Sequence, residues 1–129
     1  MTKEQVHKLT LAGLFAAMAF ACARVTFFVR SARLLEWTDE ALHWDILQLN
    51  AQRAQQCFDS WLAFGQAYAQ GRSQWVGTGR SDVLGKVVTP EEVAQWVTEE
   101  QHPWHVMDWN LVLEPAADAT PKASIAQAA

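Results

Sequence analysis

Helix-breaking residues, cysteines and clustered basic residues are all scarce in this chain of 129 residues. The first proline is Pro90, and no glycine lies between residues 14 and 64, which leaves helix as the default conformation for about fifty residues. Two cysteines, Cys22 and Cys57, are too few for a disulfide framework. The net charge is −4 and no basic stripe exists, which excludes a nucleic-acid-binding protein.

Charge is nearly absent from residues 9–29, LTLAGLFAAMAFACARVTFFV, where Arg24 is the single charged residue. A helix that is apolar on all faces lies deep in a core, in a bilayer or on another hydrophobic phase. A chain of this length has little core in which to bury it. The run therefore predicts contact with a hydrophobic partner. The large apolar side chains expected to make that contact are Leu11, Leu14, Phe15, Phe20, Phe27 and Phe28.

The charges are distributed unevenly along the chain. Residues 1–36 hold five cationic and two acidic side chains, a net charge of +3, whereas residues 81–129 hold two cationic and eight acidic ones, a net charge of −6. Cationic residues that flank an apolar segment are typical of a segment at a membrane surface. The alternative interpretation is that these charged residues only keep the two ends of the helix in water.

The first 76 residues predict a long antiparallel helical hairpin within an all-α fold. Thr2 and Gln5 can form a capping box that begins a helix over about residues 3–35. Thr38 is a suitable N-cap for a second helix over about residues 39–76.

The remainder of the chain predicts one short helix and little other regular structure. After a loop over about residues 77–88, Thr89 and Pro90 provide the start of a third helix over about residues 90–101. We expect residues 1–113 to form a single helical domain and residues 114–129, which are poor in large apolar side chains, to form a flexible, disordered tail.

The predicted second helix carries an apolar seam. Its seam positions are mostly apolar, with an interruption at Arg72, and recur in alternating steps of three and four, as at the a and d positions of a coiled coil. Seven glutamines and Asn50 lie between them. Such a helix packs along its whole length, either on the first helix or on a copy of itself. The seam residues expected to pack in this way, or to cover a hydrophobic surface, are Trp44, Leu47, Phe58, Trp61, Tyr68 and Trp75.

Three patterns that resemble reactive sites fail in detail. His102, His105 and Asp108 have the spacing of metal ligands on a helix, but Pro103 disfavours a regular helix there. The glycines between residues 77 and 85 do not match the spacing of a phosphate-binding loop, and Cys57 has no base near it in the sequence. The sequence therefore predicts no catalytic residue, no metal site and no cofactor, and we expect a non-enzymatic protein.

The N-terminus imitates a secretory signal, because lysines and an apolar stretch precede Ala21-Cys22-Ala23. A cleaved signal is followed by polar mature sequence, whereas residues 25–29 here continue the apolar run. We therefore expect the segment to remain part of the protein.

Residues 47–75, LQLNAQRAQQCFDSWLAFGQAYAQGRSQW, are rich in glutamine and alanine with interspersed Trp, Phe and Leu. This composition resembles the phasins, small helical proteins that coat polyhydroxyalkanoate storage granules in bacteria. The chain after Glu114 is also similar to the tails of these proteins. The resemblance implies helices laid on a polyester surface, oligomers, a cytoplasmic location and no catalysis.

Two functions follow from these patterns. The first is a non-enzymatic helical protein that self-associates and binds a hydrophobic surface, either a polyester granule or a lipid bilayer, in the cytoplasm or at the inner membrane. The alternative is a single-pass membrane protein with a small cytoplasmic accessory domain. As a helix, residues 9–29 are about 31 Å long, which is enough to span a bilayer.

Overall fold

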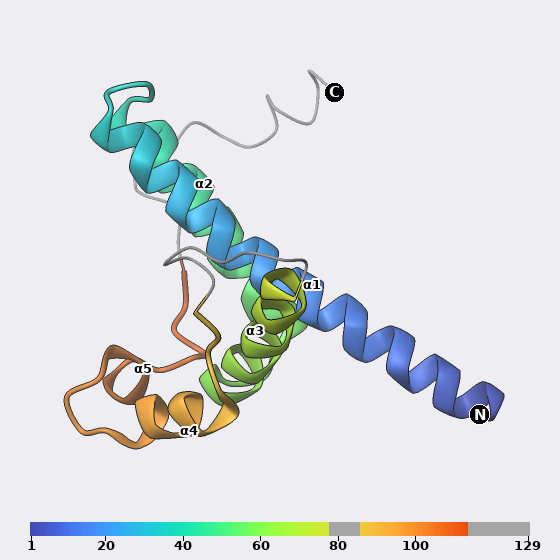
Figure 1. The fold of residues 1–129 in the computed structure, drawn as a ribbon. Coiled ribbons are helices and arrows are strands. Elements are labelled where there is room, and N and C mark those ends of the chain that lie inside the picture. The colour runs from blue at the N-terminus through green and yellow to red at the C-terminus, as the bar shows by residue number, and fades with distance from the viewer. Residues whose placement is uncertain (78–85, 114–129) are drawn as a thin grey trace.

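The all-α fold predicted from the sequence is confirmed by a computed structural model, which describes residues 1–77 and 86–113 (Figure 1). The predicted tail at 114–129 and most of the predicted loop at 77–88 lie outside the described residues. The helices are α1 (Lys3–Leu34), α2 (Glu40–Cys57), α3 (Trp61–Val76), α4 (Pro90–Thr98) and α5 (Pro103–Val106).

Helix α1 begins and ends with capping motifs. The predicted capping box is present: the Thr2 backbone N–H donates to Gln5 Oε1 at 2.8 Å, and the Gln5 N–H donates to the Thr2 hydroxyl at 3.1 Å. At the other end Glu36 adopts a left-handed φ of 61°, and the Trp37 N–H donates to the Ala32 carbonyl. This is a Schellman turn, which satisfies the last carbonyls of α1 and reverses the chain.

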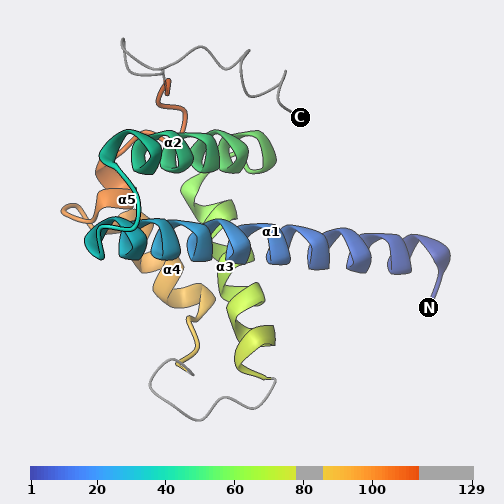
Figure 2. The same cartoon turned by 90° about the horizontal axis from the view of Figure 1, so that it is seen from above.

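Helix α2 returns antiparallel beside the C-terminal half of α1, as Figure 2 shows. The cap of α2 differs from the prediction by one position, because the Asp39 carboxylate, rather than Thr38, accepts the Leu42 N–H at 2.7 Å. Asn50 of α2 binds the two helices together. Its side-chain amide donates to the Cys22 carbonyl at 2.9 Å and to the Thr26 hydroxyl at 3.2 Å.

The prediction of one helix over residues 39–76 is wrong, because the chain breaks between α2 and α3. Phe58 leaves the helical conformation with φ −132° and ψ 151°. Ser60 then caps α3, its hydroxyl accepting the Ala63 N–H at 3.0 Å. A serine at the N-cap is enough to begin a new helix, so this break needs no glycine or proline. Helix α3 leaves in a new direction and crosses α1 (Figure 2).

The crossing of α1 and α3 depends on small residues. A Cβ atom placed on Gly71 would lie 2.5 Å from the Ala16 carbonyl oxygen, so the two backbones approach as closely as their atoms allow. Ala16 and Ala19, on the facing side of α1, are completely buried. Beside this contact the Phe20 ring packs on the rings of Tyr68 and Trp75, at centroid distances of 6.0 and 5.5 Å.

Helices α4 and α5 pack against the first half of α3. The predicted capping box at Thr89 and the proline at the first helical position are present, but α4 ends at Thr98 rather than near residue 101. Val93 of α4 is completely buried against Gly65. The single turn of α5 was not predicted from the sequence. Residues 108–113 form no strand with the other described residues.

Candidate functional site

Four rings form an aromatic cluster at the junction of α2 and α3. Trp61, the first residue of α3, stacks on Trp104 with ring centroids 5.0 Å apart and meets Trp109 edge-on at 4.9 Å. Phe64 completes the cluster against Trp104 and Trp109. Both indole N–H groups have partners: Trp61 Nε1 donates to the Met107 carbonyl at 2.9 Å, and Trp109 Nε1 donates to the Phe58 carbonyl at 2.8 Å. These tryptophans therefore hold the chain together rather than present themselves to a partner.

Glutamines of α2 hold the segment that follows α5. Gln55 Nε2 donates to the carbonyls of Trp109 and Leu111, at 2.9 and 2.8 Å, and Gln52 Nε2 donates to the Leu113 carbonyl at 3.1 Å. A segment without a strand or helix has backbone groups that need partners, and these amides provide them.

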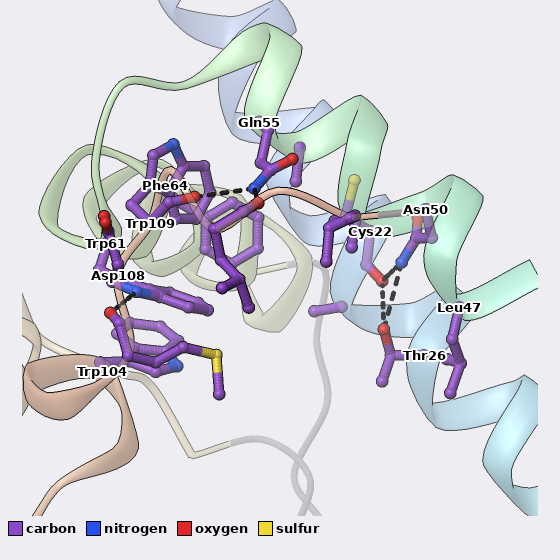
Figure 3. A pocket seen from close by; sticks show the side chains of 16 residues that line it. Cys22, Thr26, Leu47, Asn50, Gln55, Trp61, Phe64, Trp104, Asp108 and Trp109 are labelled. Carbon is purple, nitrogen blue, oxygen red and sulfur yellow. Dashed lines mark hydrogen bonds between the residues drawn. The ribbon is translucent and has the colours of Figure 1, made fainter. Parts of the chain in front are cut away.

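An apolar pocket of about 420 Å³ lies between α1, α2 and this segment (Figure 3). Its volume is within the range of small-molecule sites, which is about 300–1,000 Å³. The polar side chains on its wall include Asn50 and Gln55, whose amides already bond to backbone carbonyls. The pocket is therefore suited to an apolar group, and it offers little that would orient a polar substrate.

The two free cysteines lie near this pocket. Burial raises the pKa of the Cys22 thiol above its usual value of 9.0, the neighbouring Cys57 raises it further, and Arg53 opposes the shift. A thiol that is harder to deprotonate is a weaker nucleophile at neutral pH. This environment gives Cys22 the character of a packed apolar residue.

A second apolar hollow, of about 380 Å³, lies where α1 crosses the C-terminal half of α3. The Arg24 guanidinium covers the rings of Phe20 and Phe28, at 5.7 and 5.5 Å from their centroids. On α3, Arg72 lies over the Trp75 ring and donates to the Lys86 carbonyl. Arg24 and Arg72 thus both lie over aromatic rings at this hollow.

Helix α1 exposes many of its large apolar side chains. Only Ala16, Ala19 and Cys22 of this helix are buried. Leu14 is 62% exposed and Phe28 is 56% exposed, and Gly13 has no atom within 4 Å of the position that a Cβ would take. The N-terminal third of α1 extends past the rest of the molecule (Figures 1 and 2).

A family model with the description "Protein of unknown function (DUF1266)" covers residues 1–109. The chain belongs to the DUF1266 family. No curated protein and no solved structure matches it. The matched stretch of this DUF1266 chain includes α1 to α5 and ends at Trp109, so the aromatic cluster and the apolar face of α1 both lie within it.

The predicted seam of the DUF1266 chain is divided by the break between α2 and α3. Phe58 is buried against Phe15, and Trp61 lies in the aromatic cluster. Tyr68 and Trp75 pack on Phe20, while Leu47 lines the larger pocket. Trp44 is 58% exposed, and the buried residue at this end of α2 is His43. The six residues therefore lie in separate contacts and do not form one stripe.

The predicted apolar span of the DUF1266 chain divides in a similar way. Phe15 and Phe20 are partly covered by the Phe58 and Tyr68 rings. The remaining members, Leu11, Leu14, Phe27 and Phe28, are 39%, 62%, 68% and 56% exposed. Sequence reasoning identified the run but missed Asn50, Gln52 and Gln55, whose partners are backbone carbonyls distant in sequence.

His102 and His105 of the DUF1266 chain have structural partners. His102 Nδ1 accepts the Trp104 N–H at 3.1 Å, its ring stacks on Trp96, and His105 Nδ1 lies 2.9 Å from the Val97 carbonyl. Within residues 1–77 and 86–113, no group of three His, Cys, Asp or Glu side chains is placed to hold a metal ion.

Proposed function

We propose that this protein is non-enzymatic and associates with a hydrophobic surface through α1. The exposure of α1 carries the proposal: ten of its large apolar side chains are exposed, whereas its buried residues are two alanines and a cysteine. Soluble monomers rarely leave a contiguous apolar face of this kind uncovered. Removing one large aliphatic or aromatic side chain from water contributes about 1.5–3 kcal/mol, so several together provide a substantial affinity.

The resemblance of residues 47–75 to the phasins favours the polyester of a cytoplasmic storage granule as that surface. A lipid surface, such as that of the inner membrane, is the other form of the same proposal. The cationic side chains near the two ends of the apolar run, including Lys8 and Arg30, suit a surface that carries negative charge.

A single-pass membrane protein is the second candidate, because α1 is the one helix among the described residues that is long and apolar enough to cross a membrane. Residues 16–26 of α1, however, pack on α2 and α3. Within this stretch the Asn50 amide of α2 donates to the Cys22 carbonyl and to the Thr26 hydroxyl. A membrane span would require α1 to leave these helices, or would carry their glutamines into the hydrocarbon at a cost. This packing favours association with a surface.

Co-sedimentation with polyhydroxybutyrate particles and with phosphatidylcholine vesicles tests the proposal. The double variant Leu14→Glu/Phe28→Glu replaces two exposed side chains of α1. A matched control, Val106→Glu/Val112→Glu, makes the same charge change at apolar residues that are 68% and 76% exposed but lie outside α1. We expect the α1 variant to lower the affinity for at least one of the two surfaces by at least tenfold, and the control to bind like the wild type.

Two results would reject surface association through α1. One is wild-type protein that stays in the supernatant with both kinds of particle. The other is equal binding by the wild type and the α1 variant, with helicity confirmed by circular dichroism. Resistance of the wild type in cell membranes to extraction by alkaline carbonate would instead support the single-pass alternative.

A further inference from the structure

The larger apolar pocket extends along α2. Figure 3 shows its wall running from Leu47 and Thr26 at one end to Trp61 and Trp104 at the other. Gln55, which also lines it, lies eight residues after Leu47, so the part of the wall on α2 is about 12 Å long. An extended aliphatic chain advances about 1.2 Å per bond and covers this length with roughly ten carbons.

The polar side chains of the wall have used most of their hydrogen-bond donors. Asn50 Nδ2 donates to a carbonyl and a hydroxyl of α1, and Gln55 Nε2 donates to two carbonyls of the segment after α5. The oxygens of both amides remain as acceptors. Trp61 and Trp109 also donate to carbonyls, whereas the Trp104 indole N–H has no partner among the described residues. A hydroxyl group both donates and accepts, so it matches these atoms, whereas a carboxylate only accepts.

The charge of the wall favours a neutral ligand. Asp108 is the one charged side chain among the described residues that line the pocket. Its carboxylate repels an anionic head group. An ammonium group would lose its hydration in an apolar pocket whose one counter-charge is exposed to solvent.

We propose that this pocket binds a neutral aliphatic alcohol with an unbranched chain of about ten carbons. The pocket of about 420 Å³ belongs to a molecule in which the largest completely buried side chain is Val93. An empty apolar cavity lacks contacts on one side of its wall, and an aliphatic chain restores them.

The site is separate from the surface of the proposed function. Helix α1 contributes Cys22, Ala23 and Thr26 to the wall, and none of them is a large exposed apolar residue. The inference therefore does not depend on whether α1 binds a granule or a membrane.

Isothermal titration calorimetry of the full chain tests the proposal with 1-hexanol, 1-octanol, 1-decanol and decanoate at neutral pH. Each methylene group added between hexanol and decanol should raise the affinity about threefold to fourfold. Decanoate, which has the same chain with an anionic head group, should bind at least tenfold more weakly than decanol.

Two pairs of variants locate the site. Leu111→Glu changes a wall residue that is 51% exposed, and Leu49→Glu makes the same change at a residue of α2 that is 46% exposed and lies outside the wall. Leu111→Glu should weaken decanol binding at least tenfold, and Leu49→Glu less than threefold. Ala51→Phe, which fills the pocket from α2, should also abolish binding, whereas Ala41→Phe on the same helix should not.

Wild-type protein that binds no alcohol overturns the proposal, as does binding of decanoate that is as tight as that of decanol. Equal effects of the wall variant and its control in both pairs would also overturn it. Circular dichroism confirms that each variant is folded, and the Ala51 pair decides if Leu111→Glu unfolds the chain. The variant Leu14→Glu/Phe28→Glu separates this site from the proposed function. It should bind decanol like the wild type, and a loss of binding there would place the alcohol on α1 instead of in the pocket.

Discussion

Glu36 is the only described residue other than glycine with a positive φ, at 61°. It occupies the position after the C-cap of α1, where the left-handed conformation allows its N–H to bond to the Arg33 carbonyl at 3.0 Å. Glycine is the usual residue here, because a side chain costs about 1–2 kcal/mol in this conformation. The turn directs α2 back along α1, so a local backbone requirement sets a long-range contact.

Replacing Glu36 by glycine should therefore stabilise the protein. We expect the free energy of unfolding to rise by about 0.5–1 kcal/mol, since the relief of strain exceeds the added entropy of the unfolded chain. Urea denaturation followed by circular dichroism measures the change. Glu36→Val, which adds a β-branched side chain at the same position, should shift the midpoint in the opposite direction. A lower midpoint for Glu36→Gly would show that the turn does not control stability.

At the scale of the elements, the crossing of α1 and α3 is the contact that organises the fold. Gly71 and Ala16 bring the two backbones together, and the Phe20 ring covers the side of the crossing. Small residues give α3 room to cross α1, while ten large apolar side chains of α1 remain exposed.

A pair of glycine substitutions tests the importance of this crossing. Gly71→Ala places a methyl group 2.5 Å from the Ala16 carbonyl oxygen, and we expect it to lower the free energy of unfolding by about 1–3 kcal/mol. Gly13 lies in α1, where an added methyl group would meet no other part of the structure within 4 Å. Gly13→Ala should therefore raise the free energy of unfolding by about 0.5–1 kcal/mol. Thermal or urea denaturation of both variants measures the contrast. A change of the same sign in both would contradict the close approach at Gly71.

The starts of α1 and α4 could be predicted from the sequence, because capping is local. Thr2 and Thr89 lie within three residues of the groups that they cap. The break after Cys57 was not predicted, although Ser60 is a good N-cap. The contacts that stabilise the break are those of Trp61 with Trp104 and Trp109, which lie more than forty residues further along the chain. For the same reason the sequence identified the apolar run of α1 but not its exposed face, which depends on where α3 crosses.

At the scale of the whole molecule, the described chain has a thin core. The largest completely buried side chain is Val93, and the others of this class are alanines, whereas many leucines and phenylalanines remain exposed. Some of the apolar residues of the sequence therefore pack inside the molecule, and the others lie on its surface. A partner that covers α1 would complete the burial.

Hydrogen exchange of α1 with and without bound polyhydroxybutyrate particles tests whether a partner covers this helix. The backbone amides of residues 3–14 belong to a helical segment that projects from the molecule, so they should exchange faster than those of residues 16–26 in dilute protein. Binding to polyhydroxybutyrate particles should slow exchange across residues 3–35, most strongly in residues 11–14. Bound protein whose α1 exchanges as fast as in the free state, with protection elsewhere, would show that α1 is not the helix that the surface covers.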